Sequence, residues 1–398
     1  MAVTRIKRQR RPSRRPRLKF PRFKPPLGVY IAICALPAVM TILFYALRFN
    51  TAVMSWISMR VALPIRGFLG LITSIFPFSL MEVAIAAAIV GTIVYIFKTI
   101  KLTVNSRKRR IRVLSKRLLH IAVAALYIWG AFCWLWNTGY FARGFAERNG
   151  IEPREVSVYE LIALTEMFAA RASELAPTMS RDADGRLNED RRAVFAASGD
   201  IFQNIAQEFP ELGRKTFRPK PMMFSWLMSR TGYSGIYFAL TGEANINSNI
   251  PMSTMPATIA HELAHQLGVH AEDEANFVAI IASISSEHPV YVYSGYFFGL
   301  IHLMNALHTA DPAAWADIFA TFSPELRRDW TDNRDFWRAQ RTVDTGIGFL
   351  DTVLTAVTET AREAVNTFYD GFLRAQNQEL GLQSYGACVD LLIVYFFG

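Results

Sequence analysis

The sequence predicts a membrane protein with three N-terminal transmembrane helices followed by a mostly helical α+β domain. Long apolar runs in the first third of the chain, basic blocks between them and an acidic remainder predict this architecture. The first 117 of 398 residues carry 23 Lys and Arg and one acid, Glu82, whereas the other 281 carry 20 Lys and Arg and 32 Asp and Glu. This division of charge favours membrane topology over nucleic-acid binding, and we expect no nucleic-acid partner.

The chain begins with a basic arm, residues 1–28, that contains no acid. Its Arg- and Pro-rich composition predicts disorder and a cytoplasmic location. The membrane anchor, residues 29–137, contains three apolar runs of about the length that a spanning helix needs, at 29–47, 80–97 and 118–136.

The orientation of these spans follows from the basic segment Lys98–Arg117, which holds nine Lys and Arg and no acid. Such a loop stays in the cytoplasm, so the third span leads outward and places Trp134 and Trp136 at the outer interface. The stretch Asn50–Ser79 has intermediate hydrophobicity and is expected to be an interfacial or re-entrant helix. Membrane lipids are therefore expected partners, and the protein is expected in the inner or plasma membrane.

Residues 138–398 are expected to form an exported domain. Helical periodicity dominates this region, and Gly235–Leu240 is the best candidate strand. The final apolar segment, Ser384–Phe397, is too short to span a bilayer and is expected to join the core. The three cysteines form no CxxC motif or Cys/His cluster, which argues against a thiolate zinc site or a disulfide framework.

The chemistry is concentrated in a His-Glu-x-x-His motif. On a helix, His261 and His265 lie one turn apart on the same face, where both can bind one Zn²⁺. The neighbouring Glu262 is then the candidate catalytic residue, which accepts a proton from the attacking water and returns it to the leaving amine. Pro256 predicts the start of this helix and Gly268 its end.

A third metal ligand is expected among the acids that begin the next helix. Glu272 ranks first, because Asn276 shares its helix face and could hold a ligand histidine from the second coordination sphere. Glu274 lies on another face and is the alternative third ligand. His270 ranks behind both, since its spacing is one residue short of that in zincins with three His ligands. Acids at this position are also ordinary helix caps.

Substrate contacts are expected upstream of the motif. Tyr233 and Gly235 begin the candidate strand, along which a peptide could add as a further strand, although the same strand could simply be core. Weaker candidates to stabilise an oxyanion lie on an aromatic helical face that is more often core: Tyr291, Tyr293, Tyr296 and His302.

The motif, together with residues 272–277, resembles the bacterial membrane-anchored family catalogued as domain of unknown function 3810. Its members are classed by sequence as zinc metallopeptidases. The resemblance extends to further segments at 76–79, 231–235, 241–247, 384–386 and 389–392. It implies a zincin-like fold and a zinc site, and it supplies no substrate.

These observations predict a membrane-anchored zinc peptidase that acts on a protein or peptide on the exported side. Two other functions stay open. One is a zinc amidase that acts on cell-wall peptides, and the other is a non-catalytic membrane sensor or assembly factor that a metal stabilises.

Overall fold

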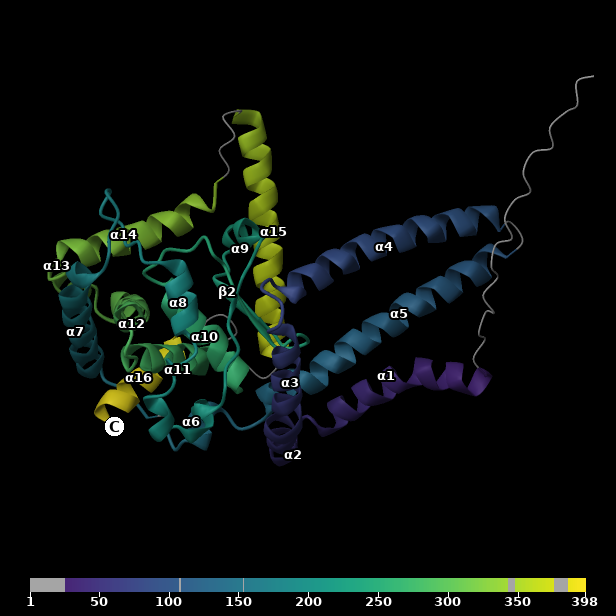
Figure 1. Cartoon of the computed structure of the whole chain (residues 1–398), viewed down its shortest axis with the longest axis horizontal. Helices are drawn as coiled ribbons and strands as arrows, with labels where there is room; N and C mark the ends of the chain where they lie inside the picture. The colour runs from purple at the N-terminus through teal and green to yellow at the C-terminus, as the bar shows by residue number, and fades with distance from the viewer. Residues whose placement is uncertain (1–25, 107–108, 153, 343–347, 376–385) are drawn as a thin grey trace, which may run out of the picture.

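The computed structural model describes residues 26–106, 109–152, 154–342, 348–375 and 386–398. The expected disorder of the basic arm falls almost entirely outside these residues. The described chain has two parts, a bundle of long apolar helices and a domain that is mostly helical with one small sheet (Figure 1).

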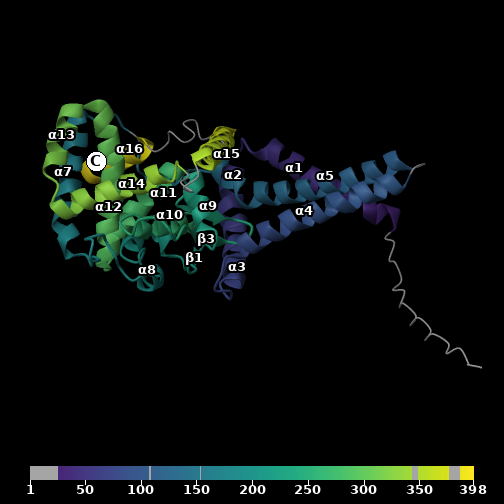
Figure 2. The same ribbon diagram turned by 90° about the horizontal axis from the view of Figure 1, so that it is seen from above.

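Three long helices run side by side away from the domain (Figures 1 and 2). They are α1 (Leu27–Leu47), α4 (Leu80–Asn105) and α5 (Arg110–Leu135). Polar groups tie α5 to α1, because Tyr127 donates to the Ile33 carbonyl at 2.8 Å and Trp134 to the Met40 carbonyl at 3.0 Å. All three helices are long and apolar enough to cross a membrane, which agrees with the predicted spans.

The basic segment between the second and third spans differs from the expected loop. Helix α4 continues to Asn105 and α5 begins at Arg110, so most of Lys98–Arg117 is helical. Lys and Arg are good helix formers, and a helix that leaves the bilayer has no reason to end at its last apolar residue.

The stretch Asn50–Ser79, expected as an interfacial or re-entrant helix, contains a fourth helical segment that is also long and apolar enough to cross a membrane, one more than the three predicted spans. It consists of α2 (Thr51–Ile57), the π-helical turn η1 (Ser58–Ala62) and α3 (Leu63–Thr73). The π turn precedes Pro64, whose missing N–H cannot complete the ordinary helical hydrogen-bond pattern. Figures 1 and 2 show this segment lying across the base of the three long helices, between them and the domain.

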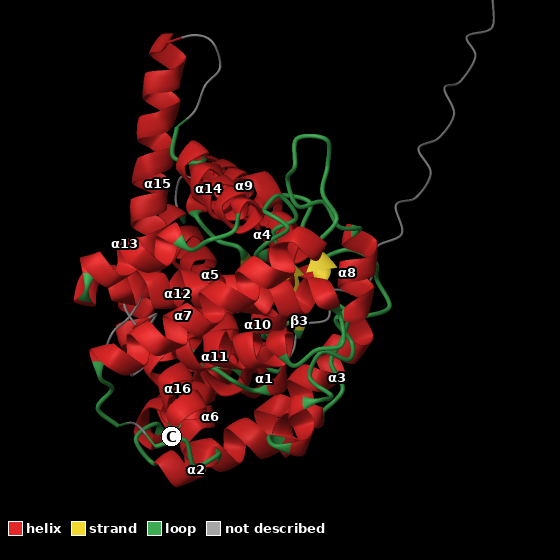
Figure 3. Cartoon of the chain, turned by 90° about the vertical axis from the view of Figure 1, so that its left-hand side faces the viewer, coloured by secondary structure: helices red, strands yellow, loops and turns green. Residues whose placement is uncertain are grey.

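The domain is built mainly from helices packed around α10 and α11 (Figure 3). The predicted Ser384–Phe397 helix is observed as α16 and contributes buried side chains to the core. The helices of the domain are α6 (Phe145–Arg148), α7 (Val158–Leu175), α8 (Arg191–Ala197), α9 (Ser225–Thr231), α10 (Met255–Leu267), α11 (Glu272–Ile284), α12 (Pro289–Ala310), α13 (Pro312–Ala320), α14 (Pro324–Ala339), α15 (Gly348–Ala375) and α16 (Ala387–Phe397). Short 3₁₀ turns are η2 (Asn137–Phe141), η3 (Ala176–Thr178), η4 (Ile205–Gln207) and η5 (Pro210–Gly213).

The sheet has three short strands in the order β1-β3-β2. They are β1 (Lys220–Pro221), β2 (Gly235–Phe238) and β3 (Glu243–Ile246), so the predicted strand is confirmed. The central strand β3 is buried throughout, parallel to β1 and antiparallel to β2. Strand β2 is therefore an edge strand among the described residues, and it packs against α10.

Hydrogen bonds join the anchor to the domain, with one carboxylate acceptor on the anchor and one on the domain. The Glu82 carboxylate, in the first turn of α4, accepts the backbone N–H groups of Met223 and Phe224, both at 2.9 Å. The Glu243 carboxylate of β3 accepts the N–H groups of Leu80 and Met81 at 3.1 and 3.0 Å. Each carboxylate satisfies two donors that would otherwise lack partners. The predicted boundary between residues 137 and 138 thus separates two parts that hydrogen-bond to each other.

Candidate metal centre

Helix α10 carries the His-Glu-x-x-His motif and is buried on nearly all sides. A proline in its first turn, Pro256, favours the start of the helix, as predicted. Gly268 ends it with a left-handed φ of 103°, which favours glycine, and a side chain there would also meet Leu63 at 3.1 Å. The chain then turns into α11, whose first residue faces back toward α10.

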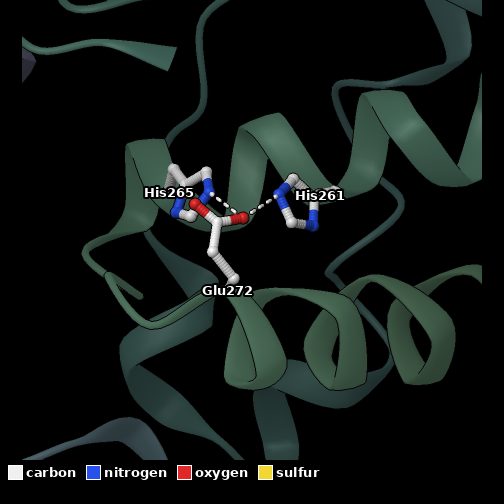
Figure 4. Close-up of side chains that lie close together, drawn as sticks. All are labelled: His261, His265 and Glu272. Atoms are coloured by element: carbon white, nitrogen blue, oxygen red, sulfur yellow. Dashed lines mark ion pairs between the residues drawn. The ribbon is translucent and has the colours of Figure 1, made fainter. Parts of the chain in front are cut away.

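Three potential ligands from these two helices converge (Figure 4). One oxygen of Glu272, Oε2, lies 3.2 Å from Nε2 of His261 and 3.7 Å from Nε2 of His265. The ligand atoms of the three residues all lie within 4.8 Å of one another. Two imidazole nitrogens and one carboxylate oxygen form a donor set that suits Zn²⁺ and leaves a coordination position for water.

The orientation of His265 fits a ligand role. Its Nδ1 lies 2.7 Å from the carbonyl oxygen of Val269, just after the helix ends. A carbonyl only accepts, so Nδ1 carries the proton and Nε2 presents its lone pair toward Glu272. A hydrogen bond on the outer nitrogen commonly fixes the tautomer of a metal-binding histidine.

Electrostatics at the site favour a cation. Burial alone would raise the pKa of Glu272, but the adjacent His265 and His261 hold it well below its usual range, so the carboxylate is ionised. Burial also disfavours charge on His265, yet the Glu272 carboxylate outweighs this effect and raises its pKa. A buried carboxylate that shares one oxygen between two imidazoles gives a metal ion the negative charge it needs.

Glu262 lies beside the ligands and is buried, with one oxygen that has no hydrogen-bond partner in the described part of the chain. Burial raises its pKa to about 7, and the charges of His261 and His265 oppose that rise. A carboxyl group with a pKa near neutrality can both accept and donate a proton at physiological pH.

The two expected substrate residues, Tyr233 and Gly235, lie next to this carboxyl group and its ligand neighbour. A Cβ atom at Gly235 would sit only 2.4 Å from Oε1 of Glu262, so β2 can approach α10 this closely only with glycine there. Burial and the nearby charge of Glu272 together raise the pKa of Tyr233 to about 12. Its hydroxyl group therefore stays protonated and can donate a hydrogen bond near the candidate metal site.

The remaining acids and amides of the motif region have other positions. Glu274, the alternative third ligand, turns away and accepts the backbone N–H groups of Phe145 and Ala146 at 2.7 and 2.9 Å, which caps α6. Asn276 is buried, but it bonds neither ligand histidine: in the described part of the chain Nδ1 of His261 has no partner, and Nδ1 of His265 is bonded to the Val269 carbonyl. The structure thus places Glu272 rather than Glu274 between the histidines, and it does not show the expected bond from Asn276.

The aromatic candidates on α12 have structural partners instead. Tyr291 donates to the carbonyl of Val194 at 2.9 Å, and Tyr293 donates to Asp329. Tyr296 packs edge-on against Phe168, and His302 packs against Phe298. We therefore assign these four residues to packing of the helical core.

Sequence reasoning missed residues that the anchor contributes to the site. Trp136, expected at the outer interface, is only 7% exposed, and its ring centre lies 5.5 Å from that of His265. It also packs 4.6 Å from His270 and donates to the Tyr140 hydroxyl at 3.2 Å. The guanidinium of Arg66, on α3, lies 5.1 Å from the Trp136 ring centre on a fully buried side chain. These contacts join segments far apart in sequence, so local patterns could not indicate them.

Comparison with known proteins gives one match. The model of the family described as "Protein of unknown function (DUF3810)" matches residues 58–393, which include the anchor from η1 onward and nearly all of the domain. No curated protein and no solved structure matches the chain.

Proposed function

The chain belongs to the family of proteins of unknown function DUF3810, and we propose that it is a membrane-anchored zinc peptidase. The observation that carries this proposal is the convergence of His261, His265 and Glu272 beside the buried carboxyl group of Glu262. Two imidazoles and one carboxylate, with a carboxyl group adjacent to the first histidine, are the parts that zinc-dependent hydrolysis of peptide bonds requires.

Each residue then has a distinct role. His261, His265 and Glu272 would hold Zn²⁺, which when bound acts as a Lewis acid on the substrate carbonyl and lowers the pKa of water. Glu262 accepts a proton from the attacking water and returns it to the leaving amine, so that one peptide and one water yield a carboxyl group and an amine. Its pKa of about 7 suits both steps.

Substrate would lie along β2. This strand pairs only with β3 among the described residues, so its other edge can accept an extended peptide. Gly235 brings that edge close to Glu262, and Tyr233 is positioned to donate a hydrogen bond to the oxyanion that develops on the scissile carbonyl.

We further propose that the domain is exported and acts on substrates at the membrane surface. The basic arm before α1 and the basic segment Lys98–Arg117 between α4 and α5 would hold those ends of the three helices in the cytoplasm, which is the predicted orientation. Trp136, directly after α5, packs against His265, so the centre lies where the anchor meets the domain. Substrates that are held at the bilayer would reach such a centre more readily than freely diffusing ones.

A structural metal is the competing function, and one observation favours it. The ligand side chains are only 5 to 12% exposed, as in metal sites that serve stability alone. A variant that removes the proton acceptor but none of the ligands separates the two functions.

The test is the Glu262→Gln variant of the full chain, purified in detergent together with the wild type. We expect the variant to keep zinc and thermal stability and to hydrolyse a quenched fluorescent peptide library at least about 100-fold more slowly. Hydrolysis at the wild-type rate, or a wild type that holds zinc but cleaves no peptide of the library, would favour the structural metal.

A further inference from the structure

A second site lies between the α2–α3 segment and the domain, beside the last turn of α10. A cavity of about 410 Å³ is lined by Arg60 and Leu63 from the α2–α3 segment, Arg214, Lys215 and Phe217 from the loop after η5, and Gln266 from α10. This volume falls within the range of roughly 300–1,000 Å³ that small-molecule sites occupy.

The charged side chains that line the cavity are all positive. Three of its lining residues, Arg60, Arg214 and Lys215, are cationic, and none of the described residues that line it is acidic. None of these three side chains forms an ion pair within the described chain. The acid nearest in sequence, Glu211, is already bound by Arg148 at 3.0 Å. All three residues are solvent-exposed, so their charges are available to bind an anion that enters the cavity from outside.

The helix that forms one wall indicates where this anion would come from. Val61, Ile65 and Phe68 form an exposed apolar stripe along one face of α3 and the preceding turn, with Phe68 61% exposed. Arg60 lies at the border of that stripe, and the whole segment lies across the base of the three long helices (Figures 1 and 2). An apolar face with cations at its border is the pattern of a helix in the interfacial region of a bilayer, at the depth of the lipid headgroups.

We propose that this cavity binds the phosphate-bearing headgroup of an anionic phospholipid. The two guanidinium groups can each hold phosphate oxygens with a pair of N–H donors, and Lys215 adds a third positive charge. Leu63 and Phe217 supply an apolar wall for the glycerol and the first acyl carbons. Because no carboxylate lines the cavity, an ammonium-bearing headgroup such as phosphocholine finds no counter-charge, whereas phosphoglycerol fits.

The bound headgroup would also steady the metal-site helix. The N–H of Phe217 donates to Oε1 of Gln266 at 2.6 Å, and Nε2 of Gln266 donates to the Gly242 carbonyl at 3.0 Å. Gln266 directly follows His265, so the basic loop is hydrogen-bonded to the residue beside a proposed ligand. This lipid site goes beyond the proposed peptidase activity and needs only that the helical bundle is embedded in a membrane.

The test measures lipid binding to the purified full chain by native mass spectrometry in detergent. Phosphatidylglycerol and phosphatidylcholine with the same acyl chains are titrated against the wild type and against Arg60→Gln/Arg214→Gln. A matched control, Arg191→Gln/Arg192→Gln, removes two exposed charges on α8 that do not line the cavity. A single exposed variant, Lys215→Gln, provides an independent arm should the double variant fail to fold.

We expect the wild type to hold phosphatidylglycerol at least about ten-fold more tightly than phosphatidylcholine. The cavity variants should lose this preference and the control should keep it. Equal binding of phosphatidylglycerol to the wild type and the cavity variants would overturn the proposal. Glycerol phosphate, added as a soluble competitor, separates the two sources of phosphate. Binding of glycerol phosphate as tightly as the lipid would show a site for soluble phosphates and would also overturn it. None of these outcomes depends on zinc or on peptide hydrolysis.

Discussion

Gly235 and Glu262 meet so closely that a Cβ atom at position 235 would lie 2.4 Å from Oε1 of the carboxyl group. The edge strand of the sheet and the helix with the metal motif are thereby held in contact at the point where substrate and proton acceptor must meet. In the proposed peptidase this contact sets the position of Glu262 relative to a peptide on β2.

Gly235→Ala should therefore damage catalysis more than metal binding. The added methyl group displaces Glu262 or β2, and a displacement of about 1 Å can cost on the order of 100-fold in rate. We expect zinc content to be retained and peptide hydrolysis to fall by about that factor. Gly199→Ala is the control, since nothing lies within 4 Å of its added Cβ. Unchanged hydrolysis by Gly235→Ala would contradict the proposal that Glu262 accepts the proton from the attacking water.

Glu272→Gln and Glu274→Gln should behave differently although they lie one helical half-turn apart. Loss of a partner behind a ligand typically weakens metal binding about 10–100-fold, so loss of the ligand Glu272 should weaken it more. Glu274→Gln should keep zinc but lower the free energy of unfolding by roughly 1–3 kcal/mol, because one amide oxygen cannot accept both N–H groups of α6. Zinc titration and chemical denaturation of both variants measure the two effects. Zinc loss in Glu274→Gln alone would reverse the assignment of the third ligand.

Zinc affinity should depend on pH through His265. Burial opposes charge on this residue, but Glu272 raises its pKa above the ordinary 6.5, so protons compete with the metal from a higher pH than for a free imidazole. Affinity should be full above the raised pKa and fall as pH is lowered through it, as a competition titration with a fluorescent chelator would show.

The same raised pKa predicts the opposite trend for stability of the metal-free protein. A group whose pKa is higher in the folded than in the unfolded state contributes stability that is fully present below the unfolded value and lost as pH rises through the folded one. Denaturation of chelator-treated protein should therefore show His265 stabilising the fold at acidic pH, and His265→Ala should abolish that component. Glu272, whose pKa is lowered by the same contact, contributes a pH dependence only at lower pH, so a His265-dependent component that grew as pH rose above about 6.5 would contradict the contact.

Glu243→Ala should lower the stability of the full chain, because it leaves the N–H groups of Leu80 and Met81 without their acceptor. The expected loss is roughly 1–3 kcal/mol in the free energy of unfolding. Glu166→Ala, at an exposed position of α7, should change it by less than about 0.5 kcal/mol. Equal stability of the two variants would mean that the anchor and the domain are not held together through this carboxylate.

Sequence patterns predicted the parts of the site that depend on local spacing. His261 and His265 are one turn apart on any helix, and Gly268 ends that helix for a conformational reason that needs no tertiary structure. Glu272 could be ranked above Glu274 only by its helix face, and the choice between them required the approach of α11 to α10.

The contributions of the anchor could not be predicted in this way. Arg66 and Trp136 lie in segments whose composition indicated only membrane proximity. Arg66 packs on Trp136 and Trp136 on His265, and both contacts depend on how the bundle docks onto the domain. The stretch Asn50–Ser79 was predicted as an interfacial or re-entrant helix and not as a span, since its hydrophobicity is intermediate; part of one face is buried inside the structure.

Whether His261, His265 and Glu272 form a zinc centre is decided by the zinc content of the purified full chain, measured for the wild type beside His265→Ala. A zinc centre at these residues predicts one zinc per chain in the wild type and none retained in the variant, with both proteins folded. A folded wild type that contains no zinc and takes up none when zinc is added would contradict it.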